Sequence, residues 1–184
     1  MLARINAKLL LNKKSPLNIK LIINAISFQV VWFICVQGNN LNAALATIVM
    51  LSLQQLIFKI NLKVWPLLIA FSLLGYLGDS VIARLLLIEY SDNLNPLAPL
   101  WLLSLWLSFA TTLNHSMKWL FKTPYLTICL ALFIVPLSYL AGINLSDSTL
   151  SGSYTLFYLS EGVWWAMLLV GYQRLIEFSG VKHD

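Results

Sequence analysis

The sequence predicts an all-α, polytopic membrane protein with six transmembrane helices and both termini in the cytoplasm. Hydrophobic residues make up 59% of the 184 residues and charged residues 10%, a composition outside the range of soluble globular domains. Eleven of the twelve Lys and Arg residues lie on alternate sides of six successive apolar runs, so that every second connection is basic. Short segments rich in Lys and Arg stay in the cytoplasm, and this alternation therefore also predicts the orientation. The exception is Arg84, at the far end of the third run.

The six predicted spans are residues 17–36, 41–58, 64–86, 98–119, 124–142 and 155–175. Six helices of ~20 residues use most of the chain, so residues 17–176 are expected to form a single transmembrane domain. Residues 1–16 alternate basic and apolar side chains, which is typical of an amphipathic segment at the inner leaflet that contacts anionic lipid headgroups. Residues 177–184 are expected to form a short cytoplasmic tail.

Prolines mark the starts of three spans, where the missing backbone N–H costs nothing; they are Pro66, Pro99 and Pro124. Pro136 lies inside the fifth span and is expected to kink it. The longer connections, residues 87–97 and 143–153, carry acidic rather than basic residues and are expected to face the periplasm. The chain is thus predicted to be a multi-pass protein of a bacterial inner membrane.

Several classes of protein are disfavoured by the same residues. The net charge of +5 comes from residues at the predicted membrane edges, so it indicates orientation rather than a nucleic-acid partner. The chain has no paired-His motif, no Cys-x-x-Cys, no phosphate-binding Gly loop and no G-x-S-x-G turn. No metal and no cofactor are therefore expected. Cys35 and Cys129 lie at opposite depths of their spans and are not expected to form a disulfide.

One group of polar residues is predicted in the outer half of the membrane. At 1.5 Å per residue, Asp79 on the outward-running third span and Glu161 on the inward-running sixth span reach similar depths. Arg84 lies near them at the outer end of the third span, and Tyr76 and Ser80 share a face with Asp79 or Arg84. Ionisable groups inside a bilayer are costly and indicate function. The group is either a salt-bridged structural lock or a site for a proton or another cation.

A second group is predicted toward the cytoplasmic side. It consists of Asn24 in the first span, Gln54 in the second, and Asn114 and His115 in the fourth. His115 and Asp79 lie at opposite ends of the bilayer, which argues against a catalytic Asp–His pair. For His115 a hydrogen-bonded packing role is favoured over a catalytic base.

A polar stripe follows the fourth span. Trp101, Ser104, Ser108 and Thr111 recur at spacings of three and four residues and therefore share one helix face. Small hydroxyl-bearing residues are the usual means of close helix packing in lipid, which is the favoured interpretation. A stripe that lines a polar cavity is the alternative. In either case the bulky residues of this span are expected to lie nearer the lipid; they are Leu102, Leu103 and Leu107.

The third and sixth spans share a weak internal similarity. Tyr76–Val81 aligns without gaps with Tyr158–Val163, 82 positions later. Because each half would contain an odd number of spans, a true repeat would be inverted, as in several transporter folds. Chance similarity between apolar segments is the alternative.

The combination of several segments resembles a known family. These segments are Asn24 with Phe28-Gln29, Trp32 and Cys35; Asp79-Ser80; Pro99–Leu102 with Leu105-Trp106 and Leu113–Ser116; and Glu161-Gly162 with Trp165. The sequence resembles a family of small bacterial inner-membrane proteins of unknown function. The resemblance covers nearly the whole chain, and the fourth span is its most specific part. Members are encoded near lipid-modifying enzymes such as cyclopropane-fatty-acid synthases, which implies such enzymes as partners.

Three functions remain open at this point. The first is an accessory or structural membrane component, associated with modification of envelope lipids. The second is a small carrier or channel that uses Asp79, Arg84 and Glu161 as an outer site. The third is an intramembrane enzyme that acts on lipid, and it is the least favoured because no nucleophile, base and orienting group are placed at one depth.

Overall fold

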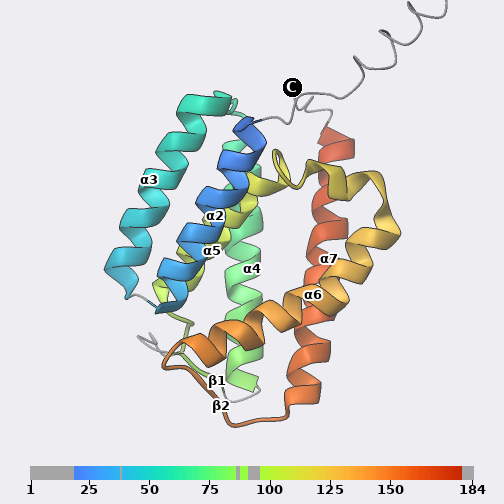
Figure 1. Ribbon diagram of the computed structural model, residues 1–184. Coiled ribbons are helices and arrows are strands. Elements are labelled where there is room, and N and C mark those ends of the chain that lie inside the picture. Colours follow the sequence, from blue (N-terminus) through green and yellow to red (C-terminus); the bar gives the residue numbers. More distant parts are fainter. Residues whose placement is uncertain (1–18, 38, 86–87, 91–95, 180–184) are drawn as a thin grey trace, which may run out of the picture.

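The computed structural model describes residues 19–37, 39–85, 88–90 and 96–179. The described chain is almost entirely helical (Figure 1). Its elements are α2 (Ile19–Gln37), α3 (Asn40–Phe58), α4 (Trp65–Leu85), β1 (Ile88–Glu89), α5 (Leu100–Leu113), a short 3₁₀ helix (Lys118–Lys122), α6 (Pro124–Leu145), β2 (Thr149–Leu150) and α7 (Tyr154–Ser179). The predicted basic segment, residues 1–16, lies outside the described residues, as do residues 180–184 of the predicted tail.

Apolar helices identify a membrane protein. Among the described residues, four helices are long and apolar enough to cross a bilayer, namely α2, α3, α4 and α6. Their outward faces expose large apolar side chains, for example Phe33 on α2 and Leu137 on α6. The other two predicted spans correspond to α5, which is shorter, and α7, which carries Glu161, Arg174 and Glu177. The all-helical class is confirmed, and the number of crossings stays a proposal.

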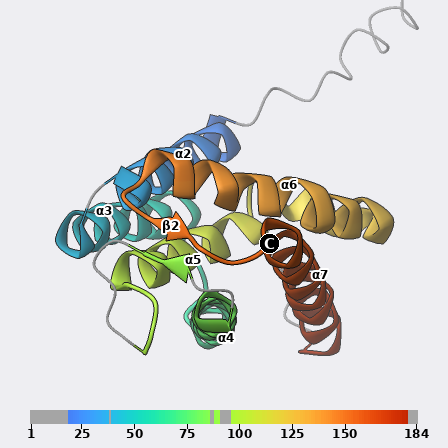
Figure 2. The ribbon, with the colours of Figure 1, turned by 90° about the horizontal axis from the view of Figure 1, so that it is seen from below.

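The helices surround α5. This helix packs against α2, α3 and α4, and α6 packs mainly along α7. Figure 1 shows α2 and α3 side by side, with α6 crossing obliquely in front of α4 and α7. Seen from below, α5 lies between the α2–α3 pair and α4 (Figure 2). The start of α2 and the end of α7 lie at the same end of the bundle (Figure 1).

The opposite end is closed by a small antiparallel pairing that the sequence did not predict. Ile88 in β1 pairs with Leu150 in β2, and Glu89 pairs with Thr149. This pairing joins the connection after α4 to the connection after α6. It places Tyr90, the residue after β1, where it is buried within the bundle.

The fourth predicted span ends earlier than expected. The prediction was 98–119, but α5 ends at Leu113 because the next residues turn back on the helix. The carbonyl of Thr112 accepts hydrogen bonds from the backbone N–H groups of His115 (3.0 Å) and Met117 (2.8 Å). The backbone N–H of Ser116 donates to Oδ1 of Asn24 at 3.2 Å, which holds this turn against α2. The fifth span, by contrast, continues as one helix through Pro136.

Glycine allows α4 to approach α5 closely. A Cβ atom at Gly75 would lie 2.4 Å from the indole of Trp106, a distance that no real contact allows. The hydroxyl of Ser72, one turn earlier, donates to the Trp106 carbonyl at 3.2 Å. Trp106 therefore sits directly on the backbone of α4.

We expect Gly75→Ala to lower the free energy of unfolding by about 1–3 kcal/mol, as overpacked core substitutions do. The matched control is Gly171→Ala on α7, where an added Cβ meets no atom within 4 Å. That change should instead stabilise the helix by about 0.5–1 kcal/mol. Denaturation of the purified variants in mixed detergent micelles measures both effects, and equal stability of the two variants would contradict the close approach.

Candidate functional site

Asp79 lies at the centre of the candidate site. Its side chain, on α4, is 0% exposed. Oδ2 accepts a hydrogen bond from Nε1 of Trp106 (2.8 Å) and another from the hydroxyl of Tyr139 (2.5 Å). The Tyr139 hydroxyl in turn accepts from Nε1 of Trp165 at 3.2 Å. Helices α4, α5, α6 and α7 thus each contribute one side chain to a single hydrogen-bonded chain of groups.

Glu161 on α7 is the second buried carboxyl group. It is also 0% exposed, and its charge and that of Asp79 are close enough to interact. Both Glu161 oxygens lack a hydrogen-bond partner, as does Oδ1 of Asp79. Within the described part of the chain no basic side chain forms an ion pair with either carboxyl group. Two acidic groups are therefore buried together without a compensating cation, an arrangement that costs free energy unless a proton or ion is bound.

Tyr90 closes the site on the β1–β2 side. Its hydroxyl is buried and has no hydrogen-bond partner. Burial, and then the charges of Glu161 and Asp79, raise the pKa of Tyr90 well above its usual value. Its ring packs edge-on against Trp101, with ring centroids 5.5 Å apart. Tyr90 therefore remains neutral, and its hydroxyl makes no hydrogen bond to either carboxyl group.

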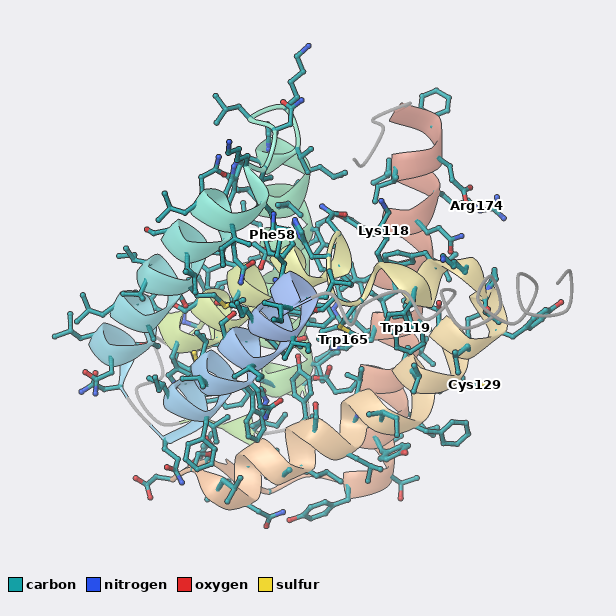
Figure 3. All side chains as sticks on the ribbon, turned by 45° about the horizontal axis from the view of Figure 1, so that its top comes forward. Phe58, Lys118, Trp119, Cys129, Trp165 and Arg174 are labelled. Atoms are coloured by element: carbon teal, nitrogen blue, oxygen red, sulfur yellow. The ribbon has the colours of Figure 1, made fainter. Side chains whose placement is uncertain are left out.

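A pocket of about 310 Å³ lies beside these groups. It is enclosed by α2, α5 and α6, with contributions from α7 and the chain around β1 and β2, and its wall is mostly apolar. Tyr90, Trp106, Tyr139 and Trp165 line it, and two of these residues, Trp106 and Tyr139, also donate hydrogen bonds to Asp79. Figure 3 shows Trp165 in the interior, whereas Arg174 on the same helix points outward. The pocket volume of about 310 Å³ is at the small end of the ~300–1,000 Å³ range of ligand sites.

The structure separates Arg84 from the two carboxyl groups. Arg84 is exposed in the last turn of α4 and forms no ion pair with Asp79 or Glu161 in the described chain. The reason is helical geometry, since five residues rotate the side chain by about 140° around the axis.

Tyr76 and Ser80 are buried, but they hold the start of α5. The Tyr76 hydroxyl donates to the carbonyl of Ala98 (2.5 Å), and the Ala98 N–H donates to Oγ of Ser80 (3.1 Å).

Of the residues predicted toward the other end, Asn24 and Gln54 are linked through Ser27, whereas Asn114 and His115 have other partners. Asn24 accepts from Ser116, and the side-chain amide of Gln54 donates to Oγ of Ser27 at 2.9 Å. Asn114 instead accepts from the Tyr172 hydroxyl at 2.8 Å. These bonds join the turn after α5 to both α2 and α7, and they join α3 to α2. Hydrogen bonds of this kind hold neighbouring helices together.

His115 lies among packing contacts at this end. Its Nδ1 is 2.7 Å from the carbonyl of Thr111, one turn earlier. Its ring packs edge-on against Phe58, with ring centroids 3.9 Å apart. These contacts agree with a packing role, and the choice between that role and a catalytic base stays a prediction.

The stripe of α5 packs against α3. All four residues of the stripe are buried; they are Trp101, Ser104, Ser108 and Thr111. The Thr47 hydroxyl on α3 donates to the Ser104 carbonyl (3.2 Å) and lies 3.1 Å from the Ser108 hydroxyl. Trp101 also lines the pocket. Most residues of the stripe therefore lie in the close contact between α5 and α3.

The expected lipid-facing side of α5 was partly wrong. Leu102 is only 2% exposed, and Leu103 and Leu107 are half-buried. The physical reason is that α2, α3 and α4 all pack around α5, which leaves it no fully exposed face.

Sequence reasoning missed the groups that complete the site. Tyr139 follows Ser138 in a largely apolar span, and Tyr90 lies in a connection, so neither belongs to a recognisable pattern. Trp106 lines the pocket and stacks on Trp165, and its indole N–H donates to Asp79.

These features define an all-helical membrane protein with a buried pair of carboxyl groups beside an apolar pocket. Residues 21–170 match the family described as a protein of unknown function (DUF2878), and the chain belongs to that family. The predicted resemblance to a family of unknown function is thereby confirmed. Comparison with curated proteins and with solved structures found no match.

Proposed function

We propose that this protein binds the acyl chain of a membrane lipid in the pocket between α2, α5 and α6. The single observation that carries the proposal is the position of this mostly apolar cavity between two membrane-type helices. The outer faces of both helices are apolar and exposed beside it, as at Phe33 on α2 and Leu137 on α6. A molecule that enters from this side would come from the hydrocarbon phase.

A few polar groups at the pocket suit a lipid with a polar end. Ser138, Ser146 and Ser148 line the pocket together with the aromatic residues of the site. Ligand pockets commonly combine an apolar wall with a few placed polar groups that orient the occupant. An accessory role beside a lipid-modifying enzyme fits such a lipid-holding protein, because it requires no catalytic group of its own. Transport of the occupant is the second candidate, and the buried Asp79–Glu161 pair is the observation that favours it.

Photolabelling with a diazirine-bearing fatty acid tests the pocket. We expect labels on peptides that contain Val135 or Gly142, both of which line it. Ser138→Phe places a ring at the pocket, and it should reduce labelling about tenfold, equivalent to ~1.4 kcal/mol of binding free energy. The control is Leu137→Phe, at the preceding residue of α6, which is exposed and does not line the pocket. Equal labelling of both variants would exclude this pocket as the binding site.

We also propose that the protein lies in a bacterial inner membrane with six crossings and both ends in the cytoplasm. The basic connections support this orientation, and so does the common end of the bundle shared by the start of α2 and the end of α7. A reporter active only in the periplasm should be inactive after Asp184 and active when inserted at Asp147, between α6 and β2. Activity after Asp184 would overturn the orientation.

A further inference from the structure

We propose that Glu161 and Asp79 together hold one exchangeable proton, and that filling the pocket adds a second proton through Tyr139. The proposal rests on the pocket function above and adds a coupled cation, the proton. It starts from the unequal surroundings of the two carboxyl groups. Asp79 accepts two hydrogen bonds on one oxygen, whereas Glu161 accepts none.

The unequal hydrogen bonding assigns the first proton. Donors that point at a carboxylate stabilise its charged form, so Trp106 and Tyr139 favour ionised Asp79. Glu161 is fully buried and accepts no hydrogen bond, and an unpaired buried carboxylate is costly, so the proton resides on Glu161. A proton on Glu161 also removes the repulsion between the two groups. The pair then carries one negative charge and one proton.

The groups around the pair are few and all are neutral donors. α5 contributes the Trp106 indole, α6 the Tyr139 hydroxyl, and the chain after β1 the Tyr90 hydroxyl. No basic side chain of the described residues pairs with either carboxyl group. The Tyr90 residue also lines the pocket on the β1–β2 side, and its hydroxyl has no hydrogen-bond partner.

Tyr139 links the pair to the pocket. Its ring lines the pocket, and its hydroxyl donates to Asp79. An occupant that displaces this ring removes one of the two donors from Asp79. The ionised form of Asp79 then loses stabilisation, and Asp79 binds a proton at its free oxygen, Oδ1. Each occupied pocket therefore takes up one proton, and release of the occupant returns it.

Infrared spectroscopy of the full protein in nanodiscs of phosphatidylethanolamine and phosphatidylglycerol tests the first proton. A protonated carboxyl group gives a carbonyl stretch above the amide bands that shifts in D₂O. We expect this band at neutral pH in the wild type, its loss in Glu161→Gln, and its retention in Glu177→Gln, an exposed residue on the same helix. An absent wild-type band, a band that persists in Glu161→Gln, or a band that sodium ions abolish would overturn the proposal.

The second proton is tested without a known ligand. Tyr139→Phe removes the donor and should add a second protonated carboxyl band, which is lost again when Asp79→Asn is added. Ser138→Phe should add the same band by filling the pocket, whereas Leu137→Phe should not. Identical spectra of the Ser138 and Leu137 variants would overturn the coupling. Fatty-acid photolabelling of the same samples separates the two proposals, because it reports on the pocket and not on the protons.

Discussion

Replacing Trp106 by alanine is expected to lower the free energy of unfolding by about 3–5 kcal/mol, the usual cost of removing a buried large aromatic side chain. The indole rests on Gly75 and stacks on Trp165, with ring centroids 4.2 Å apart and planes inclined by 21°. Its N–H also donates to Asp79. The substitution therefore creates a cavity and leaves the buried carboxyl group with one donor fewer.

Two further variants separate these contributions. Trp106→Phe keeps a ring on Gly75 but removes the N–H that donates to Asp79. Because hydrogen bonds to charged groups contribute about 1.5–3 kcal/mol, we expect a loss of stability of that size. Trp119→Ala is the control, because this tryptophan is 50% exposed and should change stability by less than about 0.5 kcal/mol. Unfolding in mixed detergent micelles measures all three. A Trp106→Ala protein as stable as the Trp119→Ala protein would show that the site does not depend on this indole.

Local sequence patterns predicted most helix boundaries because apolar length and proline position act locally. Both gave the start of α6 at Pro124, for example. The end of α5 could not be found in this way, because residues 114–119 contain neither the proline nor the glycine that would mark a helix end. Its turn is held by Asn24, which precedes Ser116 by 92 residues. The β1–β2 pairing is likewise a contact between distant connections.

The candidate site was only partly accessible from sequence for a related reason. Counting residues along oppositely directed helices placed Asp79 and Glu161 at one depth, and depth requires only the helix rise. Which faces meet depends on packing. Arg84 has a similar depth but lies about 140° around the helix from Asp79. Tyr139 completes the site from a span whose sequence gave no sign of it.

Ser108→Phe is expected to lower the free energy of unfolding by more than about 3 kcal/mol, at the upper limit for overpacked core substitutions. It should also reduce the yield of folded protein. Ser108 is fully buried, and its hydroxyl lies 3.1 Å from that of Thr47 and donates to the Ser104 carbonyl at 2.9 Å. A phenyl ring adds volume at this fully buried position between α5 and α3, so it is expected to push the two helices apart.

Leu107→Phe introduces the same ring one residue earlier, at a half-buried position, and should cost less than about 1.5 kcal/mol. Ser108→Ala should cost only about 1 kcal/mol, because it removes the hydrogen bonds without adding volume. Yield of folded protein and unfolding in detergent distinguish the three variants. If Ser108→Phe and Leu107→Phe are tolerated equally, α5 does not pack against α3 through this stripe. If Ser108→Ala is as damaging as Ser108→Phe, the hydroxyl rather than the close approach holds the two helices together.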